Sequence, residues 1–302
     1  MLNIKFFVSF LLLNSIGFSP FCWAMSYALP EANSRLIGQP TIHIAKKGDF
    51  FQALAEQYNV GFYALIAANK QLDPFLIEPG TEVIIPTQML LPYAKREGIV
   101  VNLAELRLFY YPPGENIVHV FPVGIGRAGL LTPRVISEIS EKRENPVWRP
   151  TEETRARHLA DTGEELAKEV LPGPNNPFGK YALRIGRTVY LLHGSNERFG
   201  IGMRASAGCI RLYDEDIEWL FENVEIGTPI RIVDQAIKMS YEPTLEKLIE
   251  AHEPLSYSEG DEIEEVASEG VLRFVGESQE AQQFFQRLLA EPTGLVHKLP
   301  RP

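Results

Sequence analysis

Three side chains in the second half of the chain could together perform nucleophilic catalysis by a cysteine thiol. His193 ends an apolar run, and Cys209 follows 16 residues later, after a loop that is punctuated by glycines. A free thiol is mostly protonated at neutral pH, so a cysteine nucleophile needs a neighbouring base or a positive environment. We expect His193 to be that base and Arg211 to be the nearby cation.

The residues around Cys209 are small or polar, as a catalytic loop requires. Gly208 allows a tight turn, and the backbone amides near Gly208 and Cys209 are expected to stabilise a tetrahedral oxyanion. Arg211 is expected to bind a carboxylate or stabilise the thiolate, because its guanidinium donates in a fixed fork. Gly194 and Ser206 complete the predicted site. Each residue alone is common in a structural role, so the prediction rests on their combination.

The N-terminus predicts export. Lys5 precedes a short apolar run, Phe6 to Leu13, and Ala24 offers a small-residue cleavage point, which is the pattern of a secretory signal peptide over residues 1–24. An uncleaved anchor is the alternative, although the run is short for a membrane span. Cleavage near Ala24 would remove Cys22 and leave Cys209 as the only thiol. Exported proteins usually pair their cysteines, so a single one indicates a chemical role.

Charge and histidine spacing argue against two classes of partner. The formal charge is −10, and residues 241–302 carry 13 acidic and five basic side chains, so most of the negative charge lies in this tail. No basic region suited to nucleic acid is present. The six histidines show no short metal-ligand spacing, so we predict neither a metal nor another cofactor.

A first structured unit is predicted between residues 41 and 87. Residues 41–45 alternate like a half-exposed strand, and apolar residues at helical spacing follow over 50–58 and 62–69. Residues 83–85 before Pro86 then read as a closing strand. Asp49 is expected to cap the first helix. The predicted order is strand, helix, helix, strand.

This unit resembles the LysM module. The matching features are the Gly48-Asp49 turn, the helix Leu54-Ala55-Glu56-Gln57-Tyr58, Asn69, and the end Pro79-Gly80-Thr81…Ile84-Ile85-Pro86. The resemblance implies binding to glycans that contain N-acetylglucosamine, here those of peptidoglycan. One module usually binds weakly, so tethering would be its task. A small packing domain that binds nothing is the alternative.

The region 97–234 is predicted to be a mainly β catalytic domain, which makes the chain an α+β protein. Asp214 is expected to cap its one well-marked helix, whose apolar face would hold Ile217, Leu220 and Val224. A polar insertion is expected around 141–178. Apolar runs bounded by turn signals predict seven strands, at residues 99–103, 106–111, 117–123, 135–139, 181–185, 188–192 and 230–233.

Residues 235–302 are predicted to form an acidic C-terminal extension. It would contain a linker rich in serine, glutamate and glycine over about 256–270, a short strand from Val271 to Val275, and a helix from Gln279 to Leu289. The sequence leaves open whether this extension packs on the catalytic domain.

The motifs around Cys209 also resemble those of a known family. The segment His193-Gly194-Ser195-Asn196…Phe199-Gly200-Ile201-Gly202-Met203-Arg204…Ser206-Ala207-Gly208-Cys209-Ile210-Arg211 resembles the catalytic signature of L,D-transpeptidases of the YkuD type. Three further stretches, 123–126, 145–150 and 172–183, resemble the ErfK-like branch, which carries an N-terminal LysM module. Two positions depart from the pattern: Ala207 stands where relatives commonly have histidine, and Arg134 follows Thr132-Pro133. The resemblance implies a β-sandwich-like catalytic domain.

The resemblance also implies a reaction. Cys209 would attack the carbonyl at the L-centre of diaminopimelate in a peptidoglycan tetrapeptide stem and release the terminal D-alanine, with His193 as general acid and base. The acyl group would pass to an amine, either a lysine of an outer-membrane lipoprotein or another diaminopimelate. The protein would then be a periplasmic enzyme of cell-wall cross-linking or lipoprotein anchoring. No cofactor is implied.

The same sequence features bear on four other functions. Hydrolysis of the thioester by water would make the same site an L,D-carboxypeptidase, which is the first alternative. A papain-like cell-wall endopeptidase usually has its cysteine before its histidine, whereas here His193 comes first. A zinc amidase is disfavoured because the histidines of this sequence show no short metal-ligand spacing. A glycan-binding protein without catalytic activity would explain the LysM features but not Cys209, His193 and Arg211 together.

Overall fold

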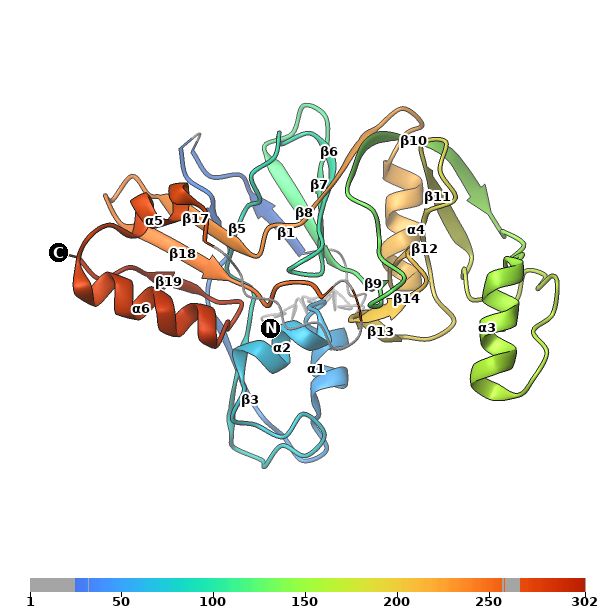
Figure 1. The fold of residues 1–302 in the computed structure, drawn as a ribbon, viewed down its shortest axis with the longest axis horizontal. Coiled ribbons are helices and arrows are strands. Elements are labelled where there is room, and N and C mark those ends of the chain that lie inside the picture. Colours follow the sequence, from blue (N-terminus) through green and yellow to red (C-terminus); the bar gives the residue numbers. More distant parts are fainter. Residues whose placement is uncertain (1–24, 32, 257, 259–266, 302) are drawn as a thin grey trace, which may run out of the picture.

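The computed structural model describes residues 25–31, 33–256, 258 and 267–301 (Figure 1). The predicted signal peptide, residues 1–24, lies outside the described residues, as does most of the predicted linker. Among the helices of the described segments, none is long and apolar enough to cross a membrane.

The N-terminal unit has the predicted order of strand, helix, helix and strand. Its elements are β3 (Thr41–Ile44), α1 (Phe51–Gln57), α2 (Phe62–Ala68) and β4 (Glu82–Ile85), with β3 and β4 antiparallel. Their core contains the buried side chains of Phe51, Leu54, Leu65, Val83 and Ile85.

Two polar residues close this small unit. The Asn69 side chain donates to the Ile84 carbonyl at 2.8 Å and accepts from the Ile84 N–H at 2.8 Å, so it ties the end of α2 to β4. The prediction that Asp49 caps α1 is wrong, because the N-cap is Phe50 and has no side-chain cap. The Asp49 carboxylate instead accepts from the Lys46 N–H and lies 2.8 Å from His43 Nε2. The Asp49 side chain therefore stabilises the turn before α1 and not the first turn of the helix.

A nine-stranded mixed sheet forms the centre of the molecule. All seven predicted strands occur in it, and the sequence did not indicate its two edge strands, β1 from the polar leader and β15 beside Cys209. In sheet order the strands are β1 (Met25–Ala28), β8 (Ile117–Pro122), β7 (Arg107–Tyr111), β6 (Gly98–Asn102), β16 (Pro229–Val233), β10 (Val135–Glu144), β11 (Tyr181–Ile185), β12 (Leu191–His193) and β15 (Ile210–Arg211).

Two hydrophobic clusters cover this sheet. Side chains alternate between the faces of a strand, so in β6 Ile99 and Val101 enter one cluster while Val100 enters the other. Helix α4 (Asp214–Asn223) covers the first cluster through Ile217 and Leu220. The second cluster is covered by the small pair β2 (Leu36–Ile37) and β5 (Met89–Leu90).

The polar insertion and the C-terminal extension lie at opposite ends of the molecule (Figure 1). Helix α3 (Glu152–Thr162) extends from the polar insertion at one end and buries none of its side chains. Between the N-terminal unit and α4, β9 (Ile125–Gly126) pairs with β14 (Arg204–Ser206), which follows β13 (Phe199–Gly202). At the other end, the C-terminal unit packs β17 (Ile237–Tyr241), β18 (Lys247–Ala251) and β19 (Val296–Lys298) against α5 (Glu269–Val275) and α6 (Gln279–Ala290).

The predicted strand from Val271 to Val275 is wrong, because these residues form α5. The Ser268 side chain caps the helix by accepting from the Val271 N–H. Val271, Phe274 and Val275 are buried, and their spacing is that of one helix face. The β-branched residues at both ends of this short run imitated a strand, whereas the cap and the helical spacing decided the structure.

Buried ionic groups join the C-terminal unit to the central sheet. Lys238 is fully buried, and its Nζ lies 2.7 Å from Glu105 Oε2 and 3.1 Å from Glu250 Oε1. Arg107 Nη1 lies 3.1 Å from Glu105 Oε2 and 3.4 Å from Glu250 Oε1. Glu105, Glu250 and His252 could together present ligand atoms to a cation, but Lys238 and Arg107 already compensate the carboxylates. Burial opposes ionisation of Glu250, yet Lys238, His252 and Arg107 hold its pKa well below the usual range.

Replacement of Lys238 tests this junction. Lys238→Met should lower the free energy of unfolding by about 3–5 kcal/mol, because it leaves two buried carboxylates short of a cation. The matched control is Lys298→Met, whose exposed ion pair with Glu246 should contribute at most about 1 kcal/mol. Urea unfolding measures both. Equal, small effects would contradict an essential role for the buried pair.

Candidate active site

The parallel pairing of β12 with β15 positions the predicted catalytic residues. Leu192 pairs with Ile210 and His193 with Arg211. Leu192 and Ile210 are fully buried in the core, so the period of two places His193 and Arg211 on the opposite face. Cys209 immediately precedes β15 and is partly exposed. Arg211 lowers the pKa of both Cys209 and His193, which places the three side chains in one electrostatic environment.

A tight turn brings Cys209 into this position. Gly208 has φ +103°, and a Cβ there would lie 2.7 Å from the Tyr190 ring. The Gly208 N–H donates to Ser206 Oγ at 3.1 Å, and the Ser206 hydroxyl donates to the Cys209 carbonyl at 2.5 Å. Ser206 therefore closes the turn, and in this state the Gly208 N–H, one of the expected oxyanion donors, is already engaged.

His193 is a neutral base with a defined tautomer. It is 3% exposed, and burial lowers its pKa to about 3, despite its hydrogen bond to Gly194. Its Nδ1 lies 2.6 Å from the Gly194 carbonyl oxygen. A carbonyl only accepts, so Nδ1 carries the proton and Nε2 keeps its lone pair. The imidazole packs on the Phe178 ring with centroids 4.7 Å apart, and Trp148 lies beyond Phe178.

Asp214 supports the turn that follows His193, a role that sequence reasoning missed. The prediction that it caps α4 is wrong: the N-cap is Tyr213 and has no side-chain cap. Asp214 Oδ1 instead accepts from the Ser195 N–H at 3.1 Å. A Cβ at Gly194 would lie 2.1 Å from that oxygen, and one at Gly179 would lie 2.4 Å from it. The two glycines were the available signal, because they let the carboxylate reach the backbone beside His193.

The thiol is protonated in the resting site. Burial raises the pKa of Cys209, although a backbone hydrogen bond with Leu191 and the Arg211 charge act in the other direction. No hydrogen bond joins Cys209 to His193 in the described part of the chain. The site therefore combines a neutral thiol with a neutral imidazole.

Arg211 is a partly buried cation that lacks an ion-pair partner within the described ranges. Its Nε is buried without a hydrogen bond, and burial lowers the pKa of its guanidinium, against the pull of Glu197 and Cys209. A desolvated guanidinium without a counter-ion is costly unless an anionic ligand supplies one. The geometry thus provides an anion-binding group two residues after the thiol.

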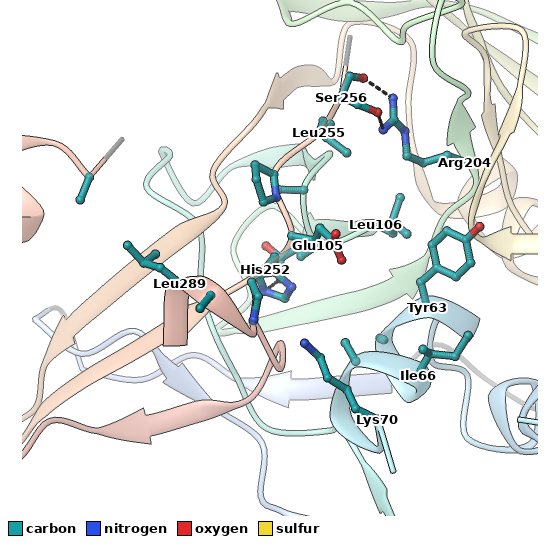
Figure 2. Close-up of a pocket in the computed structure, with 18 of the residues that line it drawn as sticks. Tyr63, Ile66, Lys70, Glu105, Leu106, Arg204, His252, Leu255, Ser256 and Leu289 are labelled. Atoms are coloured by element: carbon teal, nitrogen blue, oxygen red, sulfur yellow. Dashed lines mark hydrogen bonds and ion pairs between the residues drawn. The ribbon is translucent and has the colours of Figure 1, made fainter. Parts of the chain in front are cut away.

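A cavity of about 1200 Å³ lies elsewhere, where the N-terminal unit, the central sheet and the C-terminal unit meet (Figure 2). Its lining includes Tyr63 from α2, Lys70 just after that helix, His252 after β18, and Leu289 from α6, but neither Cys209 nor His193. Figure 2 shows Arg204 reaching across to Ser256, where its two terminal nitrogens donate to Oγ at 2.7 Å and to the carbonyl at 2.6 Å. This cavity is a junction between units and is distinct from the Cys209 site.

Comparison with known proteins places the chain in a family. Residues 96–232 match the L,D-transpeptidase catalytic domain, YkuD, and residues 43–86 match the LysM domain. Over 238 residues the chain is 50% identical to the probable L,D-transpeptidase YcfS of Escherichia coli K12, which covers 77% of this chain and 74% of that protein. The chain belongs to the L,D-transpeptidase family.

Other members of the L,D-transpeptidase family agree with this placement. The probable L,D-transpeptidase ErfK/SrfK of Escherichia coli K12 is 47% identical over 236 residues, 77% of this chain and 76% of that one. These relatives confirm the ErfK-like resemblance seen in the motifs. Among solved structures, an L,D-transpeptidase from Mycobacterium smegmatis aligns at 21% identity with a TM-score of 0.36, covering 51% of this chain and 63% of that chain.

Alkylation of Cys209 tests the electrostatics of this L,D-transpeptidase site. Because the pKa of Cys209 is raised, its rate of reaction with iodoacetamide should rise about tenfold per pH unit from 6 to 9 without a plateau. Arg211→Gln should slow alkylation at pH 8 by about 3- to 10-fold, since removal of the cation raises the thiol pKa further. Peptide mass mapping separates Cys209 from Cys22.

The matched control is Arg211→Lys, which keeps the positive charge and should react within about twofold of the unmodified protein. Equal rates for Arg211→Gln and the unmodified protein would show that Arg211 does not act on the thiolate.

Proposed function

We propose that this protein is an exported L,D-transpeptidase that uses Cys209 and His193 to transfer a peptidoglycan acyl group to an amine. The observation that carries the proposal is the β12–β15 pair, which sets His193 beside Arg211. Cys209 immediately precedes β15 and so lies at the same edge of the sheet. The family match supports this reaction type. The predicted signal peptide and the LysM domain support a location in the periplasm, on peptidoglycan.

In the first half-reaction, Cys209 attacks the carbonyl at the L-centre of diaminopimelate in a tetrapeptide stem. The resting group is a thiol, so His193 Nε2 takes its proton as the carbon–sulfur bond forms. Burial disfavours the imidazolium, so His193 passes the proton promptly to the departing D-alanine nitrogen. The products of this step are a thioester and free D-alanine.

In the second half-reaction, an amine attacks the thioester. His193 Nε2 removes the amine proton, the new amide bond forms, and the sulfur leaves and regains a proton as the Cys209 thiol. The energy of the original peptide bond is retained in the thioester, so no nucleotide is consumed. The proposed acceptor is a lipoprotein lysine or the side-chain amine of a second diaminopimelate.

Substrate recognition is assigned to Arg211 and an aromatic wall. The unpaired Arg211 guanidinium would bind a carboxylate of the stem peptide or the oxyanion of the tetrahedral intermediate. Phe178 and Trp148 would line the approach to His193. Gly194 and Gly208 serve close packing, and Ser206 holds the turn, so their proposed contribution is to position Cys209 and His193.

Product analysis tests the reaction. The purified protein is incubated with tetrapeptide muropeptides, with and without an amine acceptor, and products are followed by mass. D-alanine release and a cross-linked product are expected with the acceptor. Cys209→Ala should abolish both, and His193→Ala should slow them by about 10²- to 10⁴-fold.

The matched control is His158→Ala, which removes an imidazole from α3. Release of D-alanine by Cys209→Ala at the unmodified rate would refute the enzyme assignment. Release without any acceptor adduct would instead identify an L,D-carboxypeptidase, with water as the acceptor.

The LysM domain is proposed to bind the glycan strand through exposed apolar side chains. Phe75 and Leu76, in the segment between α2 and β4, are 69% and 75% exposed, which is unusual for adjacent large apolar residues. Cys209→Ala protein should pellet with purified sacculi, and Phe75→Ser with Leu76→Ser should reduce pelleting by about tenfold. The control is Leu245→Asn, an 87% exposed position in the turn between β17 and β18 of the C-terminal unit. Unchanged pelleting would assign glycan binding elsewhere.

A further inference from the structure

The LysM domain packs directly against the segment that leads to Cys209. A Cβ at Gly202 would lie 2.3 Å from Gly61 Cα, so the two backbones touch. Beside this contact, the rings of Phe62 and Phe199 lie 5.8 Å apart. Arg198 lies at the rim, where its ion pairs connect α1 of the LysM domain with α4 of the catalytic domain.

A buried polar pair lies within this interface. Asn59 and Asp216 are each 2% exposed, and Asn59 Nδ2 donates to Asp216 Oδ1 at 3.2 Å. The other oxygen of each side chain, Asn59 Oδ1 and Asp216 Oδ2, is buried and has no hydrogen-bond partner. Leaving both of these buried acceptor oxygens without a hydrogen-bond donor costs free energy. A proton on Asp216 Oδ2 would satisfy both, because it turns that atom into a donor toward Asn59 Oδ1.

We propose that Asp216 is protonated in the folded protein and forms a two-hydrogen-bond acid–amide pair with Asn59 that holds the LysM domain against the Cys209 segment. The inference goes beyond the proposed function and does not depend on it. In this pair the amide of Asn59 donates to Asp216 Oδ1, and the acid of Asp216 donates to Asn59 Oδ1. Asn59 Oδ1 and Asp216 Oδ2, which burial would otherwise leave without a partner, are then hydrogen-bonded to each other.

The surrounding charges agree with a neutral acid. Burial and the neighbouring Glu215 raise the pKa of Asp216 to about 8, against the hydrogen bond from Asn59 and the charge of Arg198. Two further titratable groups face this region, Tyr213 from α4 and Glu56 from α1.

The Tyr213 hydroxyl does not compete for the proposed proton position. It is buried without a hydrogen bond, so it does not donate to Asp216 Oδ2. Loss of the proton would leave a buried carboxylate oxygen facing the carbonyl of Asn59, and the interface would weaken in alkali.

The pair acts as a positioning device because of where Asp216 lies. It is in the first turn of α4, two residues after Asp214, which holds the turn beside His193. The Gly61–Gly202 contact lies at the other end of the same region, at the end of β13. The LysM domain therefore braces both sides of the chain segment that contains Cys209 and Arg211.

Stability as a function of pH tests the protonation state. A folded pKa raised above the ordinary value favours folding most below about pH 4, and this contribution is lost progressively as the pH rises to about 8. Asp216→Asn keeps both hydrogen bonds at every pH. The difference in urea midpoint between Asp216→Asn and the unmodified protein should therefore grow up to about pH 8 and then stay constant. A difference that does not change between pH 4 and 8 would overturn the proposal.

A double variant in which the two residues exchange places distinguishes the effect of the hydrogen-bonded pair from the effect of burying an acid. Asn59→Asp combined with Asp216→Asn places the acid on the LysM side and keeps the two hydrogen bonds, so it should restore the pH dependence and a midpoint near that of the unmodified protein. Asn59→Asp alone places two acids together and should be less stable at pH 7 than the double variant. If the double variant is no more stable than this single variant, Asn59 and Asp216 do not form the pair.

Hydrogen exchange reads the docking itself, independently of turnover. Amides of residues 58–62 and 199–206, corrected for intrinsic rates, should exchange at least about tenfold faster at pH 9.5 than at pH 6.5 in the unmodified protein, but not in Asp216→Asn. Asn59→Gly, which tolerates the φ of +46° at this position, should show the faster exchange at both pH values. Identical protection in all three proteins would show that the pair does not hold the interface.

Discussion

The register between β12 and β15 is the constraint on which the catalytic site depends. Leu192 and Ile210 pair across these short parallel strands and fill the core, and this places His193 and Arg211 on the opposite face. A slip of one residue would turn the functional side chains into the core and expose the apolar ones. Burial of Leu192 and Ile210 therefore fixes the positions of His193 and Arg211. Cys209 lies immediately before β15, next to this pair.

Burial then sets the protonation states that the chemistry requires. His193 is neutral with its lone pair on Nε2, Cys209 is a thiol, and Arg211 retains a charge that no acidic side chain of the described residues neutralises. Because the resting site contains no thiolate, the proposed reaction requires the Cys209 nucleophile to be generated when substrate binds. The desolvated guanidinium is stabilised most by a ligand that brings negative charge, which couples binding to activation.

The three units of the protein meet through buried polar groups as well as apolar surface. Lys238 lies between two carboxylates at the junction with the C-terminal unit, and Asn59 contacts Asp216 at the junction with the LysM domain. Such groups contribute little net stability compared with apolar packing. An arrangement of the units that separates these groups from their partners leaves buried polar or charged atoms unpaired, and it is therefore strongly disfavoured. They therefore define the relative placement of the units, which apolar contacts alone would leave adjustable.

The sequence by itself predicted the proposed nucleophile, its base, the nearby cation and seven of the nine central strands, because residue type and short-range periodicity are local properties. Only the tertiary structure decided the role of Asp214, which local capping rules placed at a helix start but which bonds to Ser195 across the fold. It also decided β1, which pairs with a strand about 90 residues away, and the neutral state of His193, which follows from burial. Hydrogen-bond partners and desolvation depend on residues distant in the chain, and no local pattern encodes them.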